Sequence, residues 1–315
     1  MNIIIFGGAG FIGTNLTFRL SECRQNQITV VDRRMDYFCF DDKANVSKVI
    51  DACDNASDFD ELVRGQDIVF HMVSTTIPST SNYHIATEIE SNVIMTVKLL
   101  DACVKNKVKR VVFLSSGGAV YGNVSECPIA EEVNTFPINS YGLQKVTIEK
   151  LLYLYWHMYK LDYRVVRLSN PYGPYQRPNG KLGVITNFVY KALNGQEVSV
   201  YGDGTVIRDF LFIDEAITAI ETLACEDSQY KLYNVGSGTG KSINELLNII
   251  ENVLDTKINV QYHEGRDVDV KENILDISRY TREYGAICHM TIEEGIKRTA
   301  EFMTRNKKLY EYYLR

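Results

Sequence analysis

The sequence predicts an α/β protein, with a Rossmann-type doubly wound parallel sheet and a smaller C-terminal lobe. Up to about residue 170, short apolar runs rich in β-branched residues alternate with segments of helical periodicity. That alternation is typical of parallel strands joined by helices. The glycine-rich turn that follows the first apolar run, "NIIIF", points the same way, because it leads directly into a helical segment.

The elements follow from these patterns in chain order. Apolar runs of strand length predict strands at residues 2–6, 27–32, 46–54, 67–72, 108–116 and 163–169. Helical spacing predicts helices at residues 11–23, 85–106 and 141–160, and then, with short strands between them, near 184–194, 214–225 and 242–255. The segment 170–183 holds three of the six prolines and is expected to be a loop. We therefore expect a Rossmann domain over residues 1–170 and a lobe over residues 171–315 that is interleaved with it.

The composition is that of an ordinary soluble globular protein. Of the 315 residues, 45% are hydrophobic and 23% are charged, and the net charge of −6 argues against binding to nucleic acid or to an anionic membrane. The apolar run at the N-terminus is too short for a signal peptide or a membrane span. Seven cysteines are scattered without a C-x-x-C pair, and no cysteine or histidine spacing is typical of zinc. We therefore expect a cytoplasmic protein with reduced thiols and no metal site.

The turn "GGAGFIG" is the first motif with chemical meaning. Gly7, Gly10 and Gly13 let the backbone turn tightly and approach a pyrophosphate. Phe11 and Ile12 begin the helix whose N-terminus would face that charge. The alternative is a tight turn without a ligand, which the complete strand–glycine–helix context disfavours.

The end of the second expected strand bears on the choice of cofactor. Asp32 stands where a carboxylate would accept from the 2′-hydroxyl of an adenosine ribose, and it would repel the 2′-phosphate of NADP. Arg33 and Arg34 follow directly, and an arginine there could bind that phosphate instead. We expect NAD as the cofactor, with Asp32 and Arg33 at its adenosine end.

Tyr141 and Lys145 form the second chemical motif, in the segment "YGLQK". They stand four positions apart on an expected helix, and therefore on one face. A nearby ammonium favours the tyrosinate, so the phenol becomes a usable general base, and the lysine could also hold a nicotinamide ribose. Alone, such a pair would be two surface residues of a helix. Downstream of the glycine-rich turn and of "SSGGAVYG" at a strand end, it predicts a catalytic pair.

These motifs, in this order, resemble those of the extended short-chain dehydrogenase/reductases, and among them the NAD-dependent nucleotide-sugar epimerases and dehydratases. The likeness is greatest to the UDP-hexose 4-epimerases and covers nearly the whole chain. Besides the segments already quoted it rests on "DACD" (51–54), "FHMVS" (70–74), "ESNVIMT" (90–96), "VRLSNPYGPYQ" (166–176), "VYGDGTVIRDFLFIDEA" (200–216), "YNVGSGTGKSINEL" (233–246) and "GRDVDV" (265–270).

The resemblance implies further site residues. Those near NAD would be Asp51 and Ala52 at the adenine, Met72 and Val73 along the pyrophosphate, and Ser74, Asn92 and Ser115 in support. Those that hold a nucleotide sugar would be Asn170, Arg208, Arg266 and Asp269 at the nucleoside diphosphate, and Ser116 and Tyr141 at the sugar. Arginines suit a diphosphate, and a carboxylate suits a ribose hydroxyl. Residues 1–170 would then bind NAD, and residues 171–315 mainly the nucleotide sugar.

One position departs from the family pattern. The family places a serine or threonine four residues before the tyrosine of "VYG", and here that position is Gly117. The nearest hydroxyls belong to Ser116, Ser115, Ser74 and Thr75. We expect Ser116 to supply the missing group. Dehydratases of the family carry an Asp–Glu pair just before "VYG", whereas Gly118 and Ala119 carry no acid, so elimination chemistry is not expected.

The resulting prediction is an NAD-dependent 4-epimerase, an isomerase that works by oxidoreductase-type chemistry on a nucleotide-activated hexose such as UDP-glucose, UDP-galactose or their N-acetyl forms. The sugar would be oxidised at C4, rotate as a bound 4-keto sugar and be reduced on its other face. Two alternatives stay open: a nucleotide-4-keto-6-deoxysugar reductase that uses NAD(P)H, and a non-catalytic nucleotide-sugar or redox-sensing module.

Two further properties follow from the resemblance. A homodimer is expected, paired through the helices at 85–106 and 141–160. The position that gates N-acetyl sugars in the family holds Asn273, which is of intermediate size, so tolerance of those sugars stays open.

Overall fold

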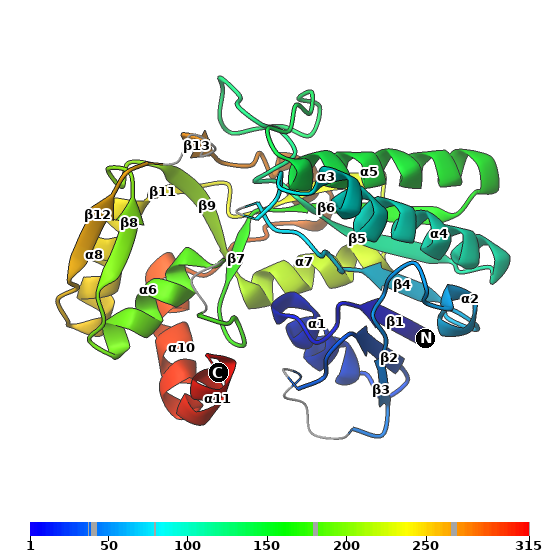
Figure 1. The fold of residues 1–315 in the computed structure, drawn as a ribbon, viewed down its shortest axis with the longest axis horizontal. Helices are drawn as coiled ribbons and strands as arrows, with labels where there is room; N and C mark the ends of the chain where they lie inside the picture. The colour runs from blue at the N-terminus through cyan, green and yellow to red at the C-terminus, as the bar shows by residue number, and fades with distance from the viewer. Residues whose placement is uncertain (37, 39–42, 79, 179–181, 266–269, 315) are drawn as a thin grey trace. The chain divides into compact units, whose positions relative to one another are not determined.

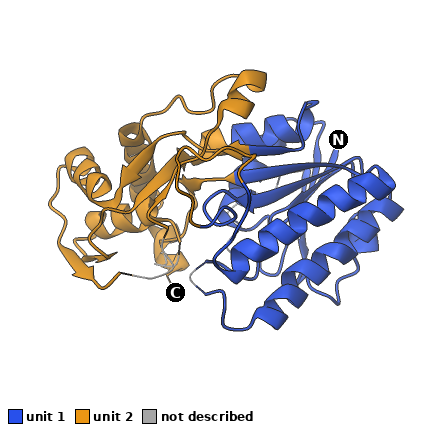
Figure 2. Cartoon of the chain, turned by 90° about the horizontal axis from the view of Figure 1, so that it is seen from above, with its two compact units in different colours: residues 1–122, 134–167, 217–233 blue, residues 123–133, 168–216, 234–315 orange. Residues whose placement is uncertain are grey.

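The computed structural model describes residues 1–36, 38, 43–78, 80–178, 182–265 and 270–314, and Figure 1 shows the helices and strands that they form. The chain forms two compact units, which Figure 2 colours separately. Unit 1 comprises residues 1–122, 134–167 and 217–233, and unit 2 comprises residues 123–133, 168–216 and 234–315. Neither unit is therefore one continuous stretch of chain.

A seven-stranded sheet forms the framework of unit 1, and it confirms the predicted fold class. Its order is β10-β6-β5-β4-β1-β2-β3, and the pairs from β5 to β3 run parallel. The strands are β1 (Asn2–Phe6), β2 (Gln27–Asp32), β3 (Val46–Ile50), β4 (Ile68–His71), β5 (Arg110–Ser116), β6 (Asp162–Leu168) and β10 (Leu232–Val235). The strand order reverses between β1 and β4. In such sheets ligands bind at that reversal, outside the carboxyl ends of the strands.

Helices pack on this sheet through their apolar faces. They include α1 (Phe11–Ser21), α2 (Phe59–Leu62), α4 (Met95–Lys105), α5 (Ser140–Tyr159) and α7 (Ile213–Cys225). Figures 1 and 2 show α4 and α5 side by side, and α5 packs on β5. Leu99 of α4 and Ile148 of α5 share one core with Val111 and Phe113 of β5. Each such buried side chain stabilises the fold by about 1.5–3 kcal/mol, so α5 is held firmly against β5.

The helix predicted at residues 85–106 is interrupted in the structure. A π-helical turn, η1 (Glu90–Ile94), separates α3 (Ile85–Ile89) from α4. Within it, the side-chain amide of Asn92 donates to Glu88 O at 2.9 Å and to Thr75 Oγ1 at 2.8 Å. The wider turn thus directs Asn92 to the segment after β4, a tertiary contact that apolar periodicity does not reveal.

In unit 2, β9 (Ile207–Phe212) pairs with β7 (Asn170–Tyr172), β11 (Gly240–Ser242) and β13 (Glu272–Asn273). A second sheet is formed by β8 (Val198–Tyr201) and β12 (Val260–His263). The helices are α6 (Val184–Leu193), α8 (Ile243–Leu254), α9 (Ser278–Tyr284), α10 (Ile292–Arg305) and α11 (Lys307–Tyr313). The Ser242–Glu245 capping box begins α8. Throughout the described part of the chain, every helix is too short or too polar to traverse a lipid bilayer.

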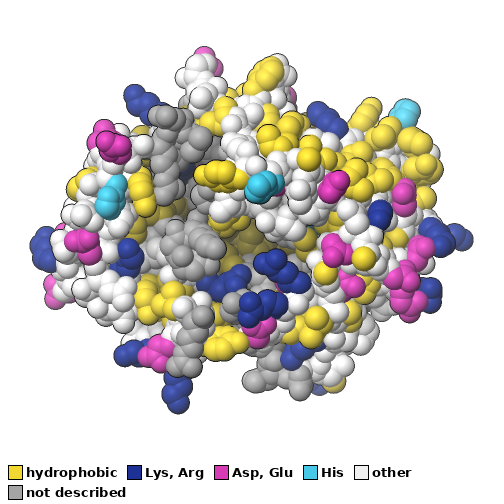
Figure 3. Space-filling model, viewed as in Figure 1, with side chains coloured by type: hydrophobic (Ala, Val, Ile, Leu, Met, Phe, Trp, Pro, Cys, Tyr) yellow, Lys and Arg dark blue, Asp and Glu magenta, His cyan; other side chains and the backbone are white. Residues whose placement is uncertain are grey.

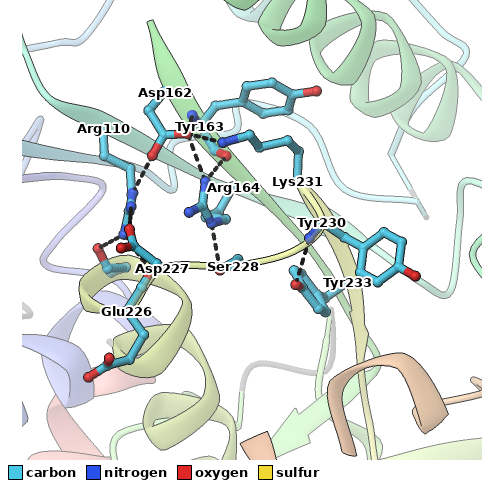
Figure 4. A network of polar contacts seen from close by, with 11 residues as sticks. Arg110, Asp162, Tyr163, Arg164, Glu226, Asp227, Ser228, Tyr230, Lys231 and Tyr233 are labelled. Atoms are coloured by element: carbon cyan, nitrogen blue, oxygen red, sulfur yellow. Dashed lines mark hydrogen bonds and ion pairs between the residues drawn. The ribbon is translucent and has the colours of Figure 1, made fainter. Parts of the chain in front are cut away.

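A polar network ties β5 and β6 to the segment before β10 (Figure 4). Asp162 accepts hydrogen bonds from Arg110 Nε at 2.7 Å, from Arg164 Nη1 at 2.8 Å and from the Lys231 ammonium. Arg110 also donates to the backbone oxygen of Ala224 in α7 at 2.7 Å. Burial alone would raise the pKa of Asp162, but the hydrogen bonds from Lys231, Arg110 and Arg164 lower it to about 2. The network therefore fastens α7 and the edge of the sheet together.

We expect Asp162→Asn to lower the free energy of unfolding by about 2–4 kcal/mol, because it would leave the buried Arg164 without its carboxylate partner. In the wild type the folded pKa of Asp162 lies below its ordinary value of about 3.9, so its contribution is full above that pH and is lost as the pH falls towards about 2. Urea unfolding at several pH values measures both effects. Glu251→Gln, which breaks an exposed pair with Lys257, is the control, and an equal effect of the two substitutions would contradict the prediction.

Candidate active site

The glycine-rich turn lies between β1 and α1, as the sequence predicts. Gly7 has a φ of +80°, and a Cβ added to it would come within 3.0 Å of the backbone of Met72 and Val73. A Cβ on Gly13 would lie 2.5 Å from the backbone of the turn itself. Gly10 caps α1 without a side-chain hydrogen bond. The turn therefore allows close approach to backbone amides at a helix N-terminus, which fits the pyrophosphate of a dinucleotide.

Asp32 ends β2 beside this turn. Its carboxylate accepts from the Ala9 amide at 3.1 Å. Burial raises the pKa of Asp32, and hydrogen bonds from the backbone of Ala9, Arg34 and Arg33 oppose that rise. Arg34 donates to Asp36 at 3.1 Å, and Arg33 is exposed. The residue at the strand end that faces the turn is thus a carboxylate, which fits a ribose hydroxyl.

We expect the protein to bind NAD at least about tenfold more tightly than NADP, because Asp32 would accept from the ribose and repel a 2′-phosphate. Calorimetric titration with each dinucleotide measures the difference. Asp32→Asn should reduce the difference in affinity between NAD and NADP, whereas the control Asp60→Asn in α2 should leave that difference unchanged. Tighter binding of NADP by the wild type would instead make Arg33 the residue that recognises the 2′ position.

Other predicted cofactor residues flank the same region. Phe11 and Ile12 are the first residues of α1. Asp51 follows β3, and its carboxylate accepts from the Cys53 amide at 2.7 Å. Ala52 is exposed beside it. A role of these residues at the adenine stays a prediction.

The segment after β4 holds the next group of predicted cofactor residues. Met72 and Val73 contact Gly7 through their backbone, so the end of β4 forms one wall of the glycine-rich turn. Ser74 Oγ donates to the backbone oxygen of Thr76 at 2.8 Å. Asn92 holds the same segment, because its Oδ1 accepts from the Thr75 amide at 2.9 Å. Ser74 and Asn92 thus fix the backbone conformation of the segment after β4 through hydrogen bonds within the protein.

Tyr141 lies in the first turn of α5, next to the turn that follows β5. A Cβ added to Gly142 would lie 2.4 Å from Ala119 O, so the helix begins in close contact with that turn. Asn139 caps the helix by accepting from the Gly142 amide at 2.8 Å. A hydrogen bond joins the side chains of Tyr141 and Ser116. The structure therefore brings Ser116, the predicted replacement hydroxyl, to the phenol.

Lys145 lies one helical turn after Tyr141. Its Nζ donates to the backbone oxygen of Leu114 at 2.7 Å and lies 5.6 Å from the centre of the Tyr141 ring. Burial lowers the pKa of Lys145 to about 8.

The electrostatics of the pair differ from the expectation. Burial raises the pKa of Tyr141 to about 12, and the hydrogen bond with Ser116 opposes this only in part. The group that opposes burial is thus Ser116, and not the ammonium of Lys145 as expected. At neutral pH the pair consists of a protonated phenol and a mostly charged ammonium. The protonated phenol can give a proton to a carbonyl oxygen, and only after losing its own proton can the phenolate, beside the ammonium, take one from a hydroxyl.

A buried ion pair, which the sequence motifs do not indicate, continues the same face of α5. Glu149 binds Arg167 at 2.6 Å, and both side chains are at most 4% exposed. Ser115, expected near the cofactor, donates to Glu149 at 2.6 Å. The charge of Glu149 also opposes the effect of burial on the pKa of Lys145. The spacing of residues 141, 145 and 149 along one helix face was the available signal.

In unit 2 the structure describes two of the predicted diphosphate-binding residues. Asn170 of β7 donates to Asp209 O at 2.9 Å, and Arg208 of β9 donates to Val270 O at 2.6 Å. The pairing of β7 with β9 brings the two residues into one sheet. Arg266 and Asp269 lie outside the described residues.

The glycine-rich segment 236–242, "GSGTGKS", does not offer a second phosphate site of the same kind. The amides of Ser237 and Gly238 donate to the carboxylate of Asp209 at 2.8 and 3.3 Å. Asp209 is fully buried. The backbone donors that a phosphate would need are therefore already used by a carboxylate of the chain.

Comparisons with known proteins agree with this geometry. Residues 3–236 match the family described as the NAD dependent epimerase/dehydratase family. The UDP-glucose 4-epimerase of Mycolicibacterium smegmatis is 29% identical over 312 residues, which cover 98% of this chain and 99% of that protein. A dTDP-4-dehydro-6-deoxyglucose reductase of Escherichia coli is 29% identical over 93% of this chain and 95% of its own length. A crystal structure of UDP-glucose 4-epimerase from Thermotoga maritima with UDP-glucose has a TM-score of 0.91 and 31% identity, covering 98% of this chain and 100% of that one.

Proposed function

Because the chain belongs to the NAD-dependent epimerase/dehydratase family, we propose that it epimerises a UDP-activated hexose at C4, with UDP-glucose and UDP-galactose as the exchanged pair. The observation that carries the proposal is the group formed by Ser116, Tyr141 and Lys145 at the end of β5. A hydroxyl and a phenol with an ammonium near the ring can move one proton on and off a sugar oxygen. NAD, when bound, takes up and returns the hydride.

The residues of the chain supply proton transfer and orientation. Tyr141, in its ionised form, would take the proton of the C4 hydroxyl during oxidation and return it during reduction. Ser116 would hold the same oxygen, and Lys145 would stabilise the phenolate. Reduction on the other face requires the 4-keto sugar to rotate without leaving. We therefore propose that the nucleoside diphosphate is the fixed part, bound by Asn170 and Arg208.

The turn after β5 argues against elimination chemistry. A dehydratase must protonate a leaving hydroxyl and remove a proton from carbon, and both tasks need acids or bases at the sugar. Residues 117–119 are Gly, Gly and Ala. The nearby carboxylate of Glu149 is bound to Arg167 inside the core. This part of the chain therefore suits proton exchange at one oxygen better than loss of water.

A 4-keto-sugar reductase is the second candidate, and one observation favours it. The pKa of Tyr141 is raised to about 12 by burial, so the phenol is protonated at neutral pH, which is the state that donates to a carbonyl. The two candidates differ in what happens to the hydride: an epimerase returns it to the sugar, and a reductase consumes reduced cofactor.

An assay without added reductant separates these functions. The purified protein should convert UDP-glucose to an equilibrium mixture with UDP-galactose, with no net change in NADH absorbance. A reductase would leave UDP-glucose unchanged and oxidise NADH stoichiometrically when given a nucleotide-4-keto-6-deoxysugar. Neither activity, with NAD retained on the protein by mass spectrometry, would support the non-catalytic module.

We also propose that the protein is a homodimer paired through α4 and α5. Large apolar side chains on α5 are 44–54% exposed, namely Leu143, Tyr153, Leu154, Met158 and Tyr159. Figure 3 shows apolar side chains gathered over the region of these helices. Exposed apolar patches of this kind usually mark an interface. Light scattering after size-exclusion chromatography should give twice the chain mass, and Met158→Glu should give the chain mass.

We propose that the protein works in the reducing environment of the cytoplasm, because its described cysteines are free thiols. The cysteines at positions 23, 53, 103, 127, 225 and 288 are free in the structure. Two of them, Cys53 and Cys103, are buried, and burial raises the pKa of each thiol. Titration of the denatured protein with a thiol reagent, without reductant, should find every thiol reduced if this is correct.

A further inference from the structure

Glu88 of α3 lies buried beside the first turn of α5. Its side chain is 7% exposed. Ser140 Oγ donates to Glu88 Oε2 at 2.5 Å, and Gln144 Nε2 donates to the same oxygen at 3.2 Å. The other carboxylate oxygen lies 3.5 Å from the His84 amide. Across the described ranges no lysine or arginine forms an ion pair with Glu88, so the two α5 side chains are its principal partners.

The two partners of Glu88 stand next to the catalytic pair in the sequence. Ser140 precedes Tyr141, and Gln144 precedes Lys145. One residue along a helix corresponds to a rotation of about 100°, so residues 140 and 144 form a stripe beside the stripe of residues 141 and 145. Holding the first stripe in place sets the rotation of the helix about its axis. It thereby sets the direction in which Tyr141 points.

The same cluster connects α5 to the segment after β4. Gln144 Nε2 also donates to Ser140 Oγ at 2.8 Å, so the two donors are joined to each other. Thr76 Oγ1 lies 3.5 Å from Gln144 Oε1, and the Ser140 amide donates to Asn82 Oδ1 at 2.7 Å. Thr76, Ser140 and Gln144 are all buried. The cluster therefore links three segments around the beginning of α5 with little access to water, where hydrogen bonds are strong and costly to leave unmade.

We propose that Glu88 is a positioning residue for the proton-transfer step: it sets the rotation of the first turn of α5 and so keeps the Tyr141 phenol against Ser116. The proposal rests on the proposed function of Tyr141. The phenol oxygen lies at the far end of a long side chain, so a small rotation of the helix displaces it appreciably. A displacement of about 1 Å at a reacting group can cost about a hundredfold in rate.

The test compares Glu88→Ala, which removes hydrogen bonds to the first turn of α5, with the loss of a hydrogen bond made by the distal half of α5. Tyr155→Phe removes the hydrogen bond from Tyr155 to Asp101, 2.6 Å long, which anchors the distal half of α5 to α4. Glu88→Ala should lower kcat at least about tenfold with KM within about twofold, and should move the acid limb of the kcat–pH profile upward. Glu88→Gln keeps an acceptor oxygen and should recover most of the rate. Tyr155→Phe should leave kcat and the pH profile unchanged.

Hydrogen–deuterium exchange supplies a readout that does not depend on activity. Glu88→Ala should speed exchange of the amides of residues 141–146, and Tyr155→Phe should not. A Glu88→Ala protein with normal kcat and normal exchange there would overturn the proposal. If that variant does not fold, Ser140→Ala replaces it with the same expected outcomes. Tyr141→Phe, assayed in parallel, separates the two ideas: an active Tyr141→Phe refutes the proposed function, whereas an inactive one beside a fully active Glu88→Ala refutes only the role of Glu88.

Discussion

Tyr141→Phe is expected to lower turnover by about a thousandfold or more, because it removes the only atom of the side chain that can exchange a proton with the sugar. The phenyl ring keeps the shape of the site, so NAD and UDP-glucose should bind nearly as well as to the wild type. The loss should therefore appear in kcat and not in KM. Coupled measurement of UDP-galactose formation gives both parameters, and calorimetry gives the affinity for NAD.

The control for this substitution removes another buried phenol. Tyr163 of β6 is 7% exposed, and Tyr163→Phe should leave kcat within about threefold of the wild type. Turnover of Tyr141→Phe within tenfold of the wild type would exclude Tyr141 from the chemistry. In that event the raised pKa of Tyr141 would reflect burial alone.

Ser116→Ala should lower kcat by about tenfold to a hundredfold with little change in KM, because the hydroxyl acts at the reacting oxygen. Burial raises the pKa of Tyr141, and the hydrogen bond from Ser116 opposes that rise. Removal of the Ser116 hydroxyl should therefore raise this pKa further and shift the acid limb of the kcat–pH profile to higher pH. A steady-state profile that extends as far above pH 10 as the protein stays folded would show both effects. Ser115→Ala is the comparison, since that hydroxyl is committed to Glu149.

Gly117→Ser decides whether Ser116 has replaced the usual hydroxyl. Gly117 is buried, and it is not among the described glycines with positive φ, so a side chain is not excluded by the backbone conformation. If Ser116 already fills the role, Gly117→Ser should leave kcat within about threefold. A harmless Ser116→Ala together with a strongly activating Gly117→Ser would mean that the wild type lacks the hydroxyl altogether. The reductase would then be favoured, since a 4-keto sugar needs only the Tyr141 phenol as donor.

Local sequence patterns determined the framework. The strands β1 and β2 have the predicted bounds, because a strand buried on both faces is marked by a run of mostly apolar residues. The glycine-rich turn could be predicted from the sequence because the backbone of Gly7 approaches Met72 so closely that no side chain fits there. The pairing of Tyr141 with Lys145 could be predicted from the sequence because two residues four positions apart lie on the same face of a helix, whatever surrounds it.

Tertiary structure decided what these residues can do. The sequence pattern predicts a lowered pKa for Tyr141, but burial raises it, and burial depends on the whole core. Whether Ser116 could replace a hydroxyl missing at Gly117 depended on how closely Gly142 lets α5 approach the turn after β5. The contact of Glu88 with α5 joins positions more than 50 residues apart, and it is specified by packing and hydrogen-bond geometry. Periodicity records which face of an element is buried, but it does not record which distant residue that face meets.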